Sequence, residues 1–78
     1  MVKVRYFAGI AELAGTSEES FATTNLGALK NEILCRHGQN MAAPLSVCAF
    51  LAEGEYLGED AALTDGITVD VLPPFAGG

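Results

Sequence analysis

Alternating apolar and charged residues near both ends of the chain predict two strands. Residues 2–7 alternate between two faces, one with Val2, Val4 and Tyr6 and the other with Lys3, Arg5 and Phe7. Phe7 is therefore an apolar residue on an otherwise charged face. Residues 67–72 alternate in the same way, and their inward positions are Ile67, Val69 and Val71. Leu72 falls on the opposite face of this last strand.

One helical pattern is long enough to cover a sheet. Apolar residues recur at three- and four-residue spacing at Leu26, Leu29, Ile33 and Leu34. Thr24 or Asn25 is suited to cap the first turn, and Gly38 is suited to end the helix. His37, in the last turn, is expected to be a capping or surface residue, because no further metal ligands surround it.

The remaining segments predict shorter elements. A helical turn over residues 10–14 follows a break at Gly9, and its spacing places Ile10, Leu13 and Ala14 on one face. Strands are expected over residues 20–23, 46–51 and 55–57, and a loop over residues 39–44. This order predicts an α+β fold of the β-grasp, or ubiquitin-like, type. Its mixed sheet would have the first and last strands as central neighbours and one main helix packed across one face.

Length and charge disfavour several classes of function. A chain of 78 residues has little room for both a core and a deep pocket, so a buried active site of its own is not expected. A net charge of −6, with only four Lys and Arg, disfavours nucleic-acid binding. No run of about 18 apolar residues is present, and no signal peptide is expected, so we predict a cytoplasmic protein that does not contact membranes. Cys35 and Cys48 fit no metal or redox spacing and are expected to be reduced and largely buried.

Four carboxylates lie close together, namely Glu53, Glu55, Glu59 and Asp60. Their spacing does not match a calcium-binding loop, so no metal site is predicted. They are better interpreted as a solvated acidic edge that protects the sheet from aggregation and can meet basic residues of a partner. The chain also lacks the motifs of nucleophilic, phosphate-binding and metalloprotease sites. We therefore expect no catalytic residues in the folded part of the chain.

Residues 73–78 are expected to form a flexible tail that follows a β-grasp domain of residues 1–72. Two prolines begin this tail and favour an extended backbone. Gly77 and Gly78 have no Cβ, so with Ala76 they can enter a channel that excludes larger side chains. The α-carboxylate of Gly78 is the candidate reactive group. Adenylation with ATP would activate it, and a sulfur donor could convert the acyl-adenylate to a thiocarboxylate.

Phe7, Leu72 and Phe75 predict an apolar docking patch near the start of the tail. If the first and last strands are adjacent, Phe7 and Leu72 share the sheet face away from the main helix. Burying one such side chain contributes about 1.5–3 kcal/mol, whereas ordering each tail residue costs about 1–2 kcal/mol. For the tail alone, the free energy gained by burial would nearly equal the entropy cost of ordering its residues. We therefore expect the sheet to supply the affinity and the tail to supply the chemistry.

Several motifs occur together near the two ends of the chain. They are VRYFA at residues 4–8, ELAGT at 12–16, LTDG at 63–66 and PPFAGG at 73–78. With this combination the chain resembles the small, sulfur-carrying subunit of molybdopterin synthase, one of the ThiS-like and ubiquitin-like carriers. The resemblance implies that an E1-like enzyme adenylates Gly78, which becomes a thiocarboxylate and enters the large synthase subunit. There the sulfur would pass to a cyclic pterin precursor, with no stably bound cofactor on the carrier.

Some positions depart from the pattern of these carriers and leave the partner open. Ala11 stands where members often have a basic residue, Glu53 lies near a position often held by Asn, and Phe75 replaces a usual Val. Ile67 and Thr68 replace a commonly acidic pair. Two alternatives stay open: a sulfur carrier for another product, such as thiazole or cysteine, and a ubiquitin-like protein modifier or interaction domain.

Overall fold

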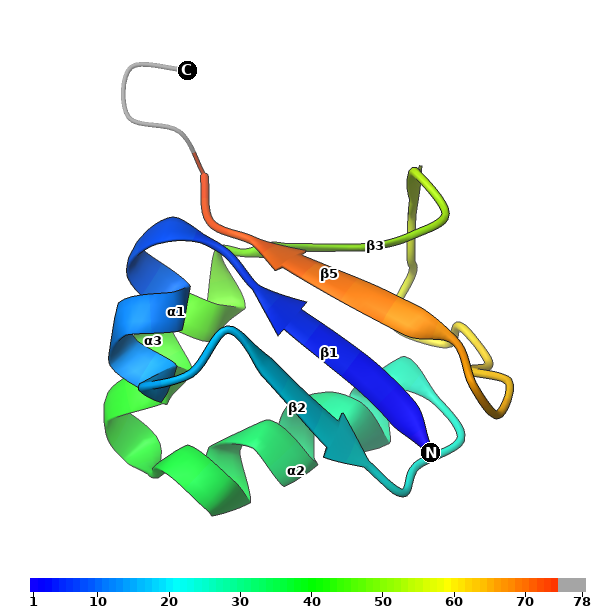
Figure 1. Cartoon of the computed structure of the whole chain (residues 1–78), viewed down its shortest axis with the longest axis horizontal. Helices are drawn as coiled ribbons and strands as arrows, with labels where there is room; N and C mark the ends of the chain where they lie inside the picture. The colour runs from blue at the N-terminus through cyan, green and yellow to red at the C-terminus, as the bar shows by residue number, and fades with distance from the viewer. Residues whose placement is uncertain (75–78) are drawn as a thin grey trace.

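The computed structural model describes residues 1–74 as a five-stranded mixed sheet with helices on one side (Figure 1). The strand order is β2-β1-β5-β3-β4, and the bounds are β1 Val2–Tyr6, β2 Glu18–Phe21, β3 Ala49–Ala52, β4 Glu55–Tyr56 and β5 Thr68–Leu72. β1 and β5 are parallel at the centre, and the other neighbouring pairs are antiparallel. The predicted β-grasp fold is confirmed, with the first and last strands as central neighbours.

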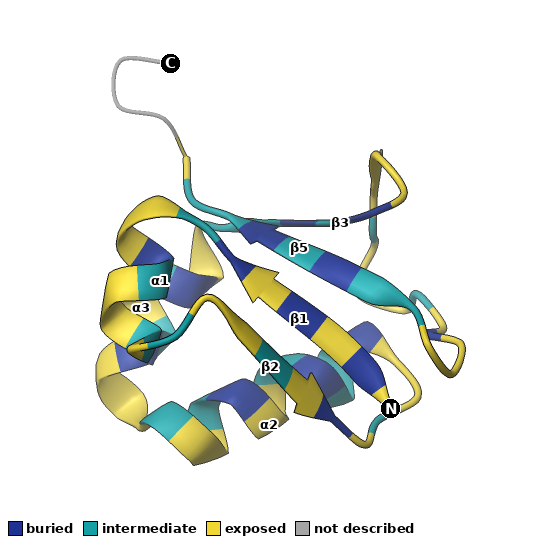
Figure 2. Ribbon diagram, in the orientation of Figure 1, coloured by how far each residue is buried: buried dark blue, intermediate teal, exposed yellow. Residues whose placement is uncertain are grey.

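One face of the sheet packs against α2, which spans Leu26–His37. β1, β5 and α2 contribute these buried residues to the contact: Val2, Val4, Tyr6, Val69, Val71, Leu26, Leu29 and Ile33. In Figure 2 the buried positions of β1 and β5 alternate with exposed or half-buried ones, as the period of a strand requires. Asn25 caps α2 as predicted, since its Oδ1 accepts a hydrogen bond from the backbone N–H of Ala28 at 2.8 Å. Gly38 ends the helix with φ 92°.

The short helical turn predicted after β1 is longer than expected and buries a different face. α1 spans Ala8–Ala14, so Gly9 lies inside it and does not break it. Ile10 is buried, and Ala11 and Ala14 pack against the core beside it. Leu13 is 54% exposed, because it lies on the flank of this contact face. Leu13 thus does not share the burial of Ile10, although their spacing places both on one predicted face.

Residues 39–44, predicted as a loop, are helical. A 3-10 helix, η1 Gln39–Met41, leads into α3 Ala42–Ser46, and the two bury Met41 and Leu45. The strand predicted from residue 46 consequently begins three residues later, at Ala49. The second strand also differs from its predicted range, residues 20–23, since β2 begins at Glu18 and ends at Phe21. In both cases long-range pairing sets the strand ends.

β5 ends at Leu72, where the predicted tail begins. The structure describes Pro73 and Pro74, whereas the predicted site residues Phe75, Ala76, Gly77 and Gly78 lie outside the described residues. The division into a domain of residues 1–72 and a tail thus stays a prediction. Within residues 1–74, no helix has the length and apolar character needed to cross a bilayer.

Candidate functional site

The open face of the sheet, opposite α2, carries the two described residues that were predicted to dock a partner. Tyr6 pairs with Val71 in the parallel register, so the next residues, Phe7 and Leu72, lie beside each other. Leu72 in turn pairs with Ala49 of β3. Phe7 and Leu72 are both half-buried, which leaves part of each side chain for another contact.

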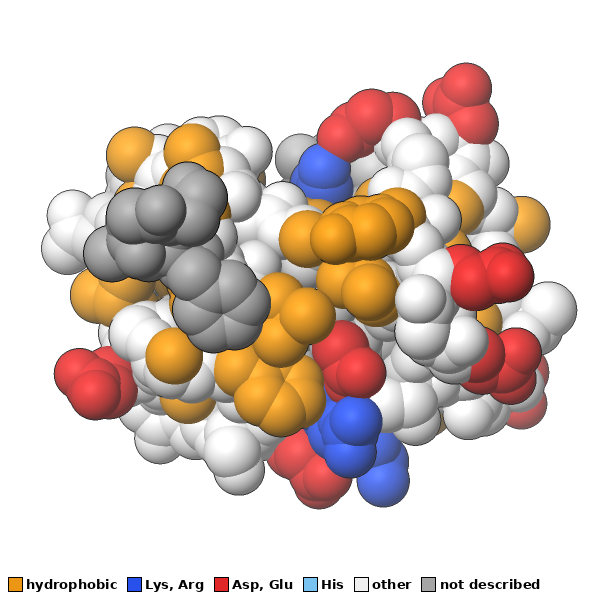
Figure 3. Space-filling view, turned by 90° about the horizontal axis from the view of Figure 1, so that it is seen from above, with side chains coloured by type: hydrophobic (Ala, Val, Ile, Leu, Met, Phe, Trp, Pro, Cys, Tyr) orange, Lys and Arg blue, Asp and Glu red, His pale blue; other side chains and the backbone are white. Residues whose placement is uncertain are grey.

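An apolar hollow of about 210 Å³ adjoins Leu72 where the chain leaves β5. Its lining residues are Val47, Ala49, Tyr56, Leu72, Pro73 and Pro74. Figure 3 shows hydrophobic side chains gathered on this face. Tyr56 is 79% exposed and Val47 61% exposed, although both are large apolar residues. Such a concave apolar site with an exposed aromatic rim is typical of binding hot spots.

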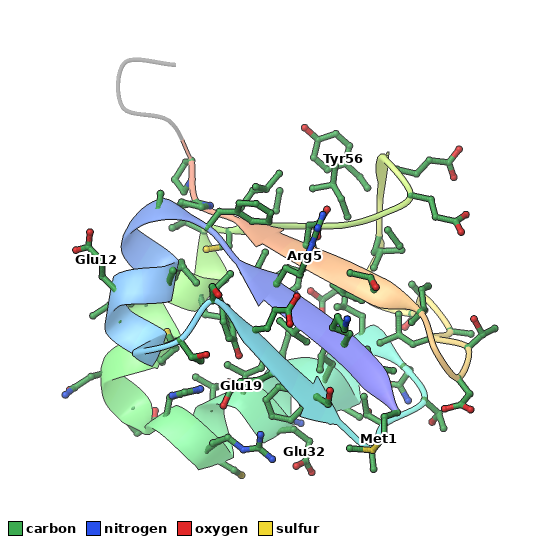
Figure 4. The ribbon with its side chains drawn as sticks, viewed as in Figure 1. Met1, Arg5, Glu12, Glu19, Glu32 and Tyr56 are labelled. Atoms are coloured by element: carbon green, nitrogen blue, oxygen red, sulfur yellow. The ribbon has the colours of Figure 1, made fainter. Side chains whose placement is uncertain are left out.

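Tyr56 was missing from the predicted docking patch. Its strand, β4, has only two residues, so no alternation pattern indicates which face it presents. The antiparallel register decides this, because Tyr56 pairs with Leu51 of β3. In Figure 4 Tyr56 rises from the sheet on the same side as Arg5, away from α2.

Two non-glycine residues with left-handed backbone flank this face. Ala8 has φ 53° directly after Phe7, and Glu53 has φ 53° in the turn between β3 and β4. A Cβ in this region costs about 1–2 kcal/mol. Strain of this kind often occurs at functional sites. At Ala8 it turns the chain sharply from β1 into α1 and keeps Phe7 at the end of the strand.

Replacing Ala8 by Gly is expected to raise the free energy of unfolding by about 0.5–1 kcal/mol. The change removes the strain of about 1–2 kcal/mol but adds about 0.5–1 kcal/mol of unfolded-state entropy. Urea unfolding measures the difference. Ala11→Gly, the same change at an ordinary position of α1, should instead lower stability by about 1 kcal/mol. If both variants changed the free energy of unfolding in the same direction, the result would contradict backbone strain at Ala8.

A salt bridge crosses the open face next to the apolar patch. Arg5 Nε and Nη2 donate to the two carboxylate oxygens of Asp70 at 2.8 and 3.2 Å. The hydrogen bond to Asp70, followed by its charge, raises the pKa of Arg5. The guanidinium carbon also lies 5.6 Å from the ring centroid of Phe7. Arg5 thereby pairs with Asp70 and lies over the ring of Phe7 as a cation–π contact.

A half-buried polar cluster joins β2 to the end of α2, on the helix side of the sheet (Figure 4). Glu19 Oε1 accepts a hydrogen bond from Tyr6 Oη at 2.8 Å and lies 2.5 Å from His37 Nε2. Arg36 Nη1 is 3.5 Å from the other carboxylate oxygen. Sequence reasoning missed this cluster because Glu19 and His37 are far apart in the chain. His37 is thus a half-buried structural residue, and its assignment as a capping or surface residue was wrong.

Opposing effects act on the pKa values in this cluster. Burial by itself would raise the pKa of Glu19, but the hydrogen bonds from His37 and Tyr6 and the nearby positive charges outweigh burial and lower it. Burial, followed by the hydrogen bond to Glu19, raises the pKa of Tyr6 far above its ordinary value. Glu19 is therefore ionised and Tyr6 neutral at physiological pH.

The two cysteines differ in burial. Cys35 is exposed and Cys48 is half-buried, and both are free thiols, so the expectation that both are largely buried was wrong for Cys35. The Sγ of Cys48 donates to the carbonyl oxygen of Pro44 at 3.2 Å, and burial raises its pKa. A raised pKa makes a thiol less reactive. Among residues 1–74, no three or more His, Cys, Asp or Glu side chains gather in a way that could hold a metal ion.

The comparison with known families covers almost the whole chain. The model of the ThiS family matches residues 4–78, which include the terminal glycines. The chain belongs to the ThiS family. A curated relative, the molybdopterin synthase sulfur carrier subunit of Chlamydomonas reinhardtii, is 34% identical over 83 residues. That match covers 99% of this chain and 98% of the relative.

Solved structures agree with this ThiS-family assignment. The putative molybdopterin converting factor subunit 1 from Pyrococcus furiosus is 30% identical, with a TM-score of 0.84 and coverage of 95% of this chain and 97% of that one. A chain in the complex of subunits 1 and 2 of the molybdopterin-converting factor from Helicobacter pylori is 24% identical, with a TM-score of 0.72 and coverage of 99% and 97%, and shows the shared fold. The family and its relatives support a sulfur-carrier role in molybdopterin biosynthesis.

Proposed function

We propose that this chain carries sulfur as a thiocarboxylate at Gly78 and delivers it to the large subunit of molybdopterin synthase. The observation that carries the proposal is the ThiS-family match, which extends through Gly78. Full-length similarity to a molybdopterin synthase sulfur carrier subunit favours molybdopterin over thiazole or cysteine as the product.

The proposed chemistry takes place at the α-carboxylate of Gly78 and needs an E1-like adenylating enzyme. A carboxylate oxygen attacks the α-phosphorus of ATP, and pyrophosphate leaves. Hydrosulfide supplied by the sulfur donor then attacks the carbonyl carbon, the bond from that carbon to the phosphate oxygen breaks and AMP leaves, so the carbon keeps one oxygen and gains one sulfur. Because glycine has no side chain, nothing next to the carbonyl hinders these attacks. The thiocarboxylate and the acyl-adenylate are covalent states of the carrier, and neither requires a stably bound cofactor.

The open face of the sheet supports the proposed delivery step. Phe7, Leu72 and Tyr56 form an apolar surface beside the point where the chain leaves β5 towards the tail. A partner bound there would lie beside the start of the tail that carries the sulfur. The complex of subunits 1 and 2 from Helicobacter pylori contains a chain of the same fold, in keeping with a large-subunit partner. Delivery in the cytoplasm stays a prediction.

Intact mass spectrometry of the protein purified from its native cell tests the proposal. We expect a fraction of the chain to have one oxygen replaced by sulfur, and fragmentation should place this change on Gly78. A chain that lacks Gly78 is the control and should not acquire the sulfur. Absence of the change after incubation with the cognate adenylating enzyme, ATP and a sulfur source would reject the carrier role. A ladder of Gly78-dependent protein conjugates would instead support a protein modifier.

A further inference from the structure

The ion pair of Arg5 and Asp70 lies between the apolar residues of the open face. Arg5 and Asp70 are partners in the register of β1 and β5, and Phe7 follows Arg5 on the same face of β1. Asp70 also pairs with Leu51 of β3, which in turn pairs with Tyr56 of β4. In Figure 3 basic and acidic side chains border the hydrophobic cluster of this face. A partner that covers both Phe7 and Tyr56 therefore also covers the ion pair.

The guanidinium of Arg5 has hydrogen-bond donors that the ion pair does not use. A guanidinium has five N–H donors, and the carboxylate of Asp70 accepts one from Nε at 2.8 Å and one from Nη2 at 3.2 Å. No other group of residues 1–74 accepts a hydrogen bond from the Arg5 side chain, which is 47% exposed. Arg5 and Asp70 also line a polar hollow of about 530 Å³ that Glu53 borders, so an incoming group has room beside them.

A docked partner would take water away from the remaining donors of Arg5. A donor that is buried without an acceptor costs free energy, and the cost is larger for a charged group. Arg5 cannot avoid this cost by losing its proton. Tight binding over this ion pair thus requires an oxygen acceptor on the partner.

The charges around Arg5 favour an acceptor that has no charge. Asp70 compensates Arg5, while Glu18 lies opposite Arg5 on β2 and Lys3 lies two residues earlier on the same face of β1. Lys3 and Glu18 are exposed and opposite in charge, and Glu53 adds one negative charge at the border of the hollow. A carboxylate that reached Arg5 would meet the repulsion of these acidic groups. A carbonyl oxygen can accept the same hydrogen bonds without that repulsion.

We propose that Arg5 is a specificity-determining residue of the open face, whose remaining N–H groups donate to an uncharged carbonyl oxygen of the large synthase subunit. The inference rests on the proposed function, since it concerns the same partner. Asp70 is then a positioning residue, because its two hydrogen bonds fix the plane of the guanidinium before the partner arrives. A protein with an apolar group at this place would leave the donors of Arg5 buried without an acceptor, and it would be rejected.

Surface plasmon resonance with the cognate large subunit measures the association and dissociation rates. The variant Arg5→Met with Asp70→Leu removes the ion pair of the open face, and the control Lys30→Met with Glu59→Leu removes the ion pair that α2 forms. Neither variant changes the net charge. Apolar replacement of a covered ion pair is often neutral or favourable, but here it would leave the partner's carbonyl without a donor. We expect the open-face variant to dissociate about 10-fold faster or more, with an association rate within about 2-fold of the wild type.

Arg5→Lys separates the donors of the guanidinium from its charge. Lysine keeps a positive charge beside Asp70 and Phe7, but it lacks the planar arrangement of N–H groups. We expect this variant to dissociate several-fold faster than the wild type. Thermal unfolding should show that every variant is folded at the temperature of the binding measurement. Wild-type dissociation of Arg5→Lys would show that only the charge acts, and it would overturn the inference.

Two further outcomes would overturn the inference. Wild-type or slower dissociation of the open-face variant would show that the partner offers no acceptor to Arg5. An equally faster dissociation of the control would show that the loss does not arise at the open face. Either result, together with binding of the wild-type chain, overturns the inference alone. Absence of any wild-type binding would overturn both the inference and the proposed function.

Discussion

Replacing both Phe7 and Leu72 by Ala is expected to weaken binding to the large synthase subunit about 10- to 100-fold. Full burial of such a side chain contributes about 1.5–3 kcal/mol. Both residues are already half-buried in the free chain, so about half of that amount remains for the partner. The two together then contribute about 1.5–3 kcal/mol, and every 1.4 kcal/mol corresponds to about a factor of ten in Kd.

Titration calorimetry with the purified large subunit measures this change in Kd. The control is Leu13→Ala on α1, which removes an exposed leucine that does not line the apolar hollow beside Leu72. Thermal unfolding should show that the double variant is folded at the temperature of the titration. An unchanged Kd would remove the open face from the proposed interface, whereas an equal loss in the Leu13 variant would place the contact elsewhere.

Replacing Glu19 by Ala is expected to lower the free energy of unfolding by about 2–4 kcal/mol. Glu19 accepts the hydrogen bond of Tyr6, a buried residue, and it also pairs with His37 and Arg36. Hydrogen bonds to a charged group contribute about 1.5–3 kcal/mol each, and a buried donor without a partner adds its own desolvation cost. Urea unfolding at neutral pH measures the loss. A loss below about 0.5 kcal/mol, the range of ordinary surface changes, would contradict the structural role of the cluster.

The same cluster predicts an acid-sensitive stability. The pKa of Glu19 is lower in the folded chain than its ordinary value of 4.5, so the folded state favours the ionised carboxylate. This contribution is present above about pH 4.5 and is lost as the pH falls through the folded-state pKa. Glu19→Gln should therefore flatten the decline of stability below that pH, while Glu32→Gln on the exposed side of α2 should keep the wild-type decline. Parallel curves for all three proteins would contradict the lowered pKa.

Local patterns were sufficient to predict the architecture. The alternation in residues 2–7 and 67–72 indicated which faces of β1 and β5 are buried, because side chains of a strand point to opposite faces in turn. The cap at Asn25 and the glycine at Gly38 marked the ends of α2, because each satisfies a backbone group that the helix leaves without a partner. With the order of elements, these signals predicted the β-grasp fold.

Two of the failures of prediction concern contacts between distant segments. Residues 39–46 are helical, and Met41 and Leu45 of this segment pack into the core. Two apolar residues four positions apart are too few to predict a helix from the sequence. Glu19 contacts Tyr6 and His37 because β2 pairs with β1 and α2 packs against these strands. No sequence pattern relates these residues to one another.

The sequence by itself thus determined the order and type of the main elements, the inward faces of the central strands and the family to which the chain belongs. It also indicated that Phe7 and Leu72 share a face, because both follow from alternation within single strands. Tertiary structure alone decided that Tyr56 joins them and that Glu53 borders a hollow with Arg5 and Asp70. The physical reason is that strand register between β1, β5, β3 and β4 sets which side chains meet across the open face.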